Sequence, residues 1–137
     1  MDTPGADLPP DVSIHFGNEP DAPRRARRAV QRLVKRDDPI ADAMILAVSE
    51  LVANVIQHTS GGGTMRAWDS PPDVAVRLEV EDHDPTVPHA ATPPPGQLSG
   101  RGLKIVDGIA DAWGVEPNGD GKVIWAEFHR NKHLPPS

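Results

Sequence analysis

The sequence predicts an α+β fold, a two-layer sandwich in which a mixed, mostly antiparallel sheet packs against three helices. Apolar residues recur at helical spacing in three segments, and short alternating segments occur in pairs around turn residues. The predicted order is β-α-α-β-β-loop-α-β-β. Hairpins that are grouped apart from helices are typical of a sheet layer covered by a helix layer.

The first predicted elements are a strand and a helix. Residues 12–16 alternate apolar and polar, as in a half-buried strand. Residues 21–36 are predicted as a helix with Asp21 as its N-cap. Its apolar stripe comprises Ala26, Ala29, Val30, Leu33 and Val34, and its other face is basic.

The second predicted helix, residues 39–58, is apolar on nearly every side, which indicates a central, buried helix. The glycines of residues 61–63 end it. Two strands follow, and turn residues join them into a hairpin. The remaining expected elements are strands 64–68 and 74–80, a long proline-rich loop over 84–100, a helix over 103–112, and strands 113–115 and 123–128.

The chain is long enough for one domain, which we place at residues 11–130 between a disordered lead (1–10) and a disordered tail (131–137). It has no cysteine, which excludes a disulfide framework and suits a reducing compartment. Neither a signal peptide nor an apolar run of membrane-spanning length is visible. The net charge of -6 argues against direct nucleic-acid binding. We therefore expect a cytoplasmic protein that uses neither membrane nor nucleic acid.

Glu50 and Asn54 are the first candidate site residues, because their spacing places both on one face of the second helix among apolar residues. A carboxylate in such surroundings needs a partner. One interpretation is a structural pair with an arginine. The other is a site in which Glu50 is a base and the Asn54 amide oxygen binds Mg²⁺.

Asp82 ends the second hairpin strand, where ligand-binding residues are often found. After the long loop, Gly100, Arg101, Gly102 and Leu103 open the third helix. Glycines allow a ligand to approach the backbone closely, and a helix N-terminus presents unpaired N–H groups. This segment is therefore a candidate phosphate-binding site.

In this order, these segments resemble the GHKL ATPase/kinase superfamily, whose ATP-binding domain has the Bergerat fold. Its motifs correspond to Ser49–His58, Val80–Pro85, Gly100–Val106 and Gly121–Phe128, so that the resemblance covers about residues 11–130. The short chain looks like the stand-alone anti-sigma-factor serine kinase branch of actinobacteria.

The resemblance implies ATP and Mg²⁺ as cofactors and a role for each matched residue. Glu50 would be the catalytic base, Asn54 would hold Mg²⁺, and Asp82 would accept the adenine amino proton. Gly100, Arg101, Gly102 and Leu103 would contact the phosphates, and residues 84–99 would form a lid over the nucleotide.

Two functions stay open. By resemblance, the protein is an anti-sigma factor and serine/threonine kinase that phosphorylates an anti-sigma antagonist. The alternative is a nucleotide-dependent binding module with little turnover, which Asp84 and Pro85 favour because the family usually has glycines there. A histidine kinase fragment is disfavoured, since no phosphoacceptor histidine on a dimerisation helix is visible.

The expected partner is a small protein, a sigma factor or its antagonist, and a homodimer is left open. Seven of the 14 Lys and Arg residues lie within residues 24–36. They form either an ordinary solvated helix face or a docking surface for an acidic protein.

Overall fold

The computed structural model describes residues 8–58, 61–83, 100–119 and 121–130. The predicted loop, the predicted tail and most of the predicted lead lie outside these residues. The elements are β1 (Val12–Phe16), α2 (Ala22–Leu33), α3 (Ala41–His58), β2 (Gly63–Asp69), β3 (Ala75–Asp82), α4 (Gly100–Ile109), β4 (Ala112–Asn118) and β5 (Gly121–His129). Their order is the predicted one.

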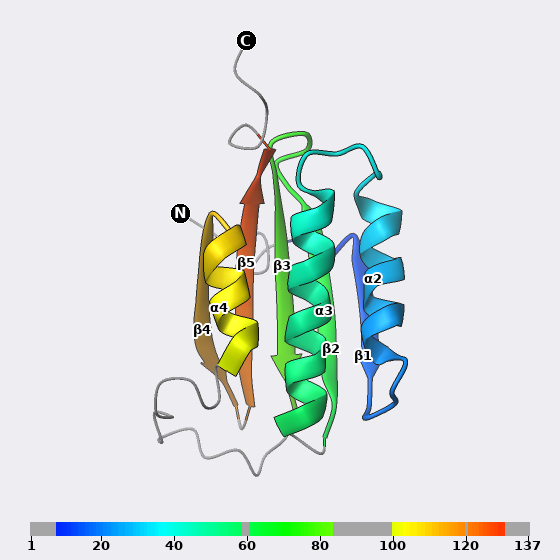
Figure 1. Cartoon of the computed structure of the whole chain (residues 1–137), viewed down its shortest axis with the longest axis vertical. Helices are drawn as coiled ribbons and strands as arrows, with labels where there is room; N and C mark the ends of the chain where they lie inside the picture. Colours follow the sequence, from blue (N-terminus) through cyan, green and yellow to red (C-terminus); the bar gives the residue numbers. More distant parts are fainter. Residues whose placement is uncertain (1–7, 59–60, 84–99, 120, 131–137) are drawn as a thin grey trace.

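The molecule has two layers, a five-stranded sheet and three helices on one of its faces (Figure 1). The strands lie in the order β1-β2-β3-β5-β4, and all four pairings are antiparallel. Helix α3 lies between α2 and α4. The predicted α+β sandwich with three helices is confirmed.

The helix boundaries differ from the predicted ones by a few residues. Helix α2 ends at Leu33 instead of 36, and Asp21 is its N-cap residue without a side-chain capping hydrogen bond; Pro23 in the first turn fits the helix start instead. Asp38 stabilises the turn that precedes α3, because its carboxylate accepts a hydrogen bond from the N–H of Ile40 at 3.1 Å. Helix α4 begins at Gly100, three residues before the predicted start, and ends at Ile109.

The core lies between the helices and the sheet. Helix α3 contributes the largest share, and strand β3 contributes every second residue, as its alternation requires. The fully buried large side chains include Met44, Val48, Leu51, Val52, Met65, Val76, Leu78, Val80, Val106 and Phe128. The prediction of a central α3 is therefore confirmed.

The other sheet face carries a charged network centred on Arg77. Arg77 on β3 is only 3% exposed; it forms ion pairs with Glu79 and Glu127, each at 3.0 Å, and lies 4.6 Å from the centroid of the Trp125 ring. Trp125 in turn covers Gly114 of β4, where a Cβ would lie 2.8 Å from the ring nitrogen. The network links β3 to β5 on the face away from the helices.

No helix in the described ranges combines the length and apolar character needed to cross a membrane.

Candidate functional site

The predicted site residues other than Glu50 belong to one end of the sandwich, the end at which α3 and β3 finish and α4 and β5 begin (bottom of Figure 1), whereas Glu50 lies near the middle of α3. We call that end the lower end. The strand register defines it, because Asp82 is opposite Gly63 on one side and opposite Lys122 on the other. Segments that are up to 70 residues apart in the sequence therefore meet there.

Asp82 continues the helix-facing row of β3, which also contains Val76, Leu78 and Val80. Its side chain is 2% exposed, and its Oδ2 accepts a hydrogen bond from the Lys122 ammonium at 2.8 Å. A carboxylate at the end of an apolar row requires such a polar partner. Asp82 is thus a buried, ion-paired acid beside the helix layer.

Two glycines let neighbouring strands lie unusually close to β3 at this end. A Cβ on Gly63 would lie 2.1 Å from the Glu81 carbonyl oxygen, and a Cβ on Gly121 would lie 1.8 Å from the Asp82 carbonyl oxygen. No side chain fits at either distance, so glycine is required at both positions. Beyond the strand, the N–H of His83 donates to the Gly62 carbonyl at 3.1 Å.

Glu50 and Asn54 lie on one face of α3, as predicted, but both are half-buried rather than enclosed by apolar residues. Ser49 shows how the helix is oriented, because its hydroxyl accepts a hydrogen bond from Arg27 of α2 at 3.3 Å. At about 100° per residue, Glu50 and Asn54 fall on the opposite flank of α3. That flank faces α4, since α2 and α4 lie on either side of α3.

The early start of α4 places Gly100, Arg101, Gly102 and Leu103 in its first turn, at the lower end. The first four N–H groups of a helix have no intrahelical acceptor. These amides therefore belong to the same end of the molecule as Asp82. The Arg101 side chain and the predicted lid, residues 84–99, lie outside the described part.

A cation at this site would need ligands from a bound molecule. Within the described ranges, no three His, Asp or Glu side chains gather where they could hold a metal ion. Mg²⁺ readily takes one or two protein oxygens and completes its shell with phosphate and water oxygens. The Asn54 amide suits that manner of binding.

Sequence analysis missed Lys122, the ion-pair partner of Asp82. The two residues are 40 positions apart, and only the register of β3 with β5 makes them neighbours. No pattern in the sequence distinguishes a buried, ion-paired lysine near the start of a strand from a solvent-exposed one.

An antiparallel sheet covered by three helices, with a Glu and an Asn on the central helix and a buried Asp at the end of β3, is the arrangement that the resemblance to the GHKL ATPase superfamily implies. The comparison with known families agrees: residues 16–128 match the model of the histidine kinase-like ATPase domain. The chain therefore belongs to the histidine kinase-like ATPase domain family.

Two individual proteins are also similar to this chain. An uncharacterized protein of Streptomyces coelicolor is 37% identical over 84 residues, an alignment that covers 58% of this chain and 79% of that protein. The crystal structure of the RsbU and RsbW domains of Rv1364c from Mycobacterium tuberculosis is similar with a TM-score of 0.60 at 20% identity. That similarity covers 88% of this chain but only 32% of the other, and it shows a shared fold.

Proposed function

We propose that the chain binds ATP with Mg²⁺ at the lower end and acts in the cytoplasm as an anti-sigma factor and serine/threonine kinase that phosphorylates an anti-sigma antagonist. One observation supports it most: in a member of this ATPase family, Asn54 near the end of α3, the buried Asp82 and the first turn of α4 belong to one end of the molecule, and Glu50 lies one turn before Asn54 on the same helix face. The resemblance to the anti-sigma-factor kinase branch and the fold shared with the RsbW-containing protein support the regulatory role.

The proposal gives each residue a binding role. Asp82 accepts a hydrogen bond from the adenine amino group, since a carboxylate only accepts. Asn54 would hold Mg²⁺ through its amide oxygen, and the ion would offset the negative charge of the phosphates. The amides of Gly100, Gly102 and their neighbours bind phosphate oxygens, helped by the positive end of the α4 dipole, and Arg101 adds a cationic contact.

Glu50 is proposed as the base. It accepts the proton of a serine or threonine hydroxyl on the partner while the hydroxyl oxygen forms a bond to the γ-phosphorus. The bond between that phosphorus and the bridging oxygen breaks, and ADP leaves with the bridging oxygen. Positioning and charge stabilisation carry most of such a reaction, which is why few catalytic side chains are needed.

The second candidate, a nucleotide-dependent binding module with little turnover, rests on a specific departure of the sequence. The positions after Asp82 at which relatives of this type usually have glycine are Asp84 and Pro85. Pro85 removes a backbone N–H and restricts its neighbour, and Asp84 adds negative charge beside a polyanion. On this candidate, the altered turn still permits nucleotide binding but not efficient turnover.

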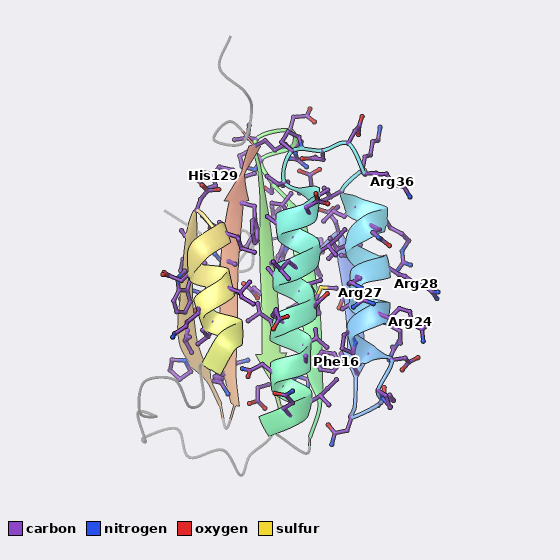
Figure 2. All side chains as sticks on the ribbon, viewed as in Figure 1. Phe16, Arg24, Arg27, Arg28, Arg36 and His129 are labelled. Atoms are coloured by element: carbon purple, nitrogen blue, oxygen red, sulfur yellow. The ribbon has the colours of Figure 1, made fainter. Side chains whose placement is uncertain are left out.

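For the protein partner, we propose a docking surface on α2. Arg24, Arg28 and Arg32 are exposed and four residues apart, so they form one stripe along the helix, and Figure 2 shows Arg24 and Arg28 on its outer side. In the described part of the chain, none of the three has an ion-pair partner. The apolar face of α2 is buried against the body of the protein, which disfavours insertion into a membrane.

Next to this stripe, a groove of about 450 Å³ separates the end of α2 from the start of α3, lined by Gln31, Val34, Arg36, Ala41, Asp42 and Ile45. Leu46, one residue further along α3, is 42% exposed. Cationic residues beside a groove whose lining is partly polar and partly apolar fit an acidic partner that also presents an apolar side chain. The groove lies at the end opposite the proposed nucleotide site, and the arginine stripe runs along the outer side of α2, so that partner and nucleotide would occupy different surfaces.

A phosphate-transfer assay tests the proposal. Proteins that co-purify from the native host are identified, and each purified candidate is incubated with the chain and γ-³²P-ATP. Label on a serine or threonine of a small antagonist-like domain is the expected result. Partner binding that requires ATP but transfers no label supports the binding module instead, and no effect of ATP on either activity contradicts both functions.

A further inference from the structure

The ion pair between Lys122 and Asp82 is largely buried at the lower end of the sheet. Asp82 is 2% exposed and the Lys122 side chain is 14% exposed, with 2.8 Å between Nζ and Oδ2. Both residues point toward the helix layer, since Lys122 precedes Ile124, Ala126 and Phe128 in the buried row of β5. Both charges therefore lie inside the proposed nucleotide site rather than on the solvated face.

The local backbone fixes this position. Lys122 is directly opposite Asp82 in the β3–β5 register, and Gly121 brings the two strands close together at that point. A residue at position 122 must place its side chain beside the Asp82 carboxylate. The ammonium has three N–H donors and no acceptor, and the bond to Asp82 uses one of them.

The pair presents an acceptor and a donor side by side. Adenine has the complementary arrangement on its Watson–Crick edge, where the exocyclic amine donates and the adjacent N1 accepts. Guanine has the reverse, because its O6 accepts and its N1–H donates. A base held in one orientation by its phosphates would meet two favourable contacts as adenine and two mismatched ones as guanine.

We propose that Lys122 is a base-contacting, specificity-determining residue, whose ammonium remains bonded to Asp82 and donates a second N–H to N1 of the adenine ring. The inference rests on the proposed function, since it requires ATP in the site. It adds a second hydrogen bond to the one assigned to Asp82, and it assigns the choice of adenine to both residues together.

The test compares ATP with 1-deaza-ATP, in which a C–H replaces N1, on the unmodified chain and on Lys122→Met. Calorimetry with Mg²⁺ present should show the unmodified chain binding ATP about 10- to 100-fold more tightly than the analogue, the usual effect of a charge-assisted hydrogen bond. Lys122→Met should bind the two nucleotides within about 2-fold of each other. The exposed Lys35, two residues after the end of α2, supplies a matched control, Lys35→Met, which should keep the original ratio.

The ratio is measured within each protein, so a general loss of stability or affinity in Lys122→Met does not obscure it. If the variant melts early and weakens both nucleotides equally, Lys122 only positions Asp82 and the inference is wrong. If the unmodified chain does not distinguish the two nucleotides, the inference is also wrong while ATP binding stands. If ATP does not bind the unmodified chain at all, the proposed function fails and the inference fails with it.

Discussion

Replacing Asn54 by alanine separates nucleotide binding from folding. Asn54 is half-buried in an interior turn of α3, where alanine favours the helix by about 0.5 kcal/mol. The side chain it removes is small, and Asn54 is half-buried and not one of the residues of the buried core cluster. The stability of Asn54→Ala should therefore equal or slightly exceed that of the unmodified chain.

The effect on ATP should be large and dependent on Mg²⁺. Without its protein ligand the metal is no longer held against the phosphates, and we expect at least about 100-fold weaker binding, or about 2.7 kcal/mol. In EDTA the variant and the unmodified chain should bind ATP with similar, weak affinity. Gln57→Ala, three residues further along the same helix and exposed, is the matched control and should change neither quantity.

Calorimetric titrations with and without Mg²⁺, together with thermal melts, provide the measurements. Unchanged Mg²⁺-dependent affinity in Asn54→Ala would refute the metal role. A parallel loss in EDTA would show that the amide contacts the nucleotide directly and not through the ion.

Three further predictions concern catalysis, the sheet and the strand ends. Glu50→Gln should lower phosphate transfer by about 10²- to 10⁴-fold and leave ATP affinity within a few-fold; joint loss of stability and binding would indicate a structural pair instead. Arg77→Met should destabilise the protein by about 2–3 kcal/mol, since it leaves carboxylates without their buried partner, and should lower Tm by roughly 10 °C with ATP affinity retained. A calorimetric Tm of Arg77→Met within about 2 °C of that of the unmodified chain would contradict the stabilising role of this network. Gly121→Ala should weaken ATP binding because its Cβ would meet the Asp82 carbonyl, whereas Gly108→Ala, with open space around it in α4, should be neutral or stabilising; equal effects in a titration would show that the close strand approach is unimportant.

Periodicity in the sequence was sufficient to predict the elements and the layers. The apolar character of α3 on nearly every side identified it as the central helix, and the alternation of β3 placed its core residues. Boundaries were less well predicted where side chains do not decide them. Gly100 and Gly102 carry little helix preference, yet α4 begins at Gly100.

Pairings across the sheet were beyond the reach of sequence patterns. Arg77 is buried on the face away from the helices because Glu79, Glu127 and Trp125 surround it, and two of these lie on another strand. Lys122 meets Asp82 for the same reason. The half-buried state of Glu50 also differs from the apolar surroundings that the sequence indicates, because the flank toward α4 is less enclosed than periodicity suggests.

The location of the nucleotide site is the central claim, and a titration of ¹⁵N-labelled protein with ATP and Mg²⁺, followed by NMR, tests it most directly. The largest amide shift changes should fall on Asn54, Asp82, Lys122 and residues 100–103, all at the lower end. The amide of Arg130, whose guanidinium bonds Asp38 and Asp69 at the opposite end, should remain unchanged. Shifts centred on Arg130, or no shifts at millimolar ATP, would contradict the account.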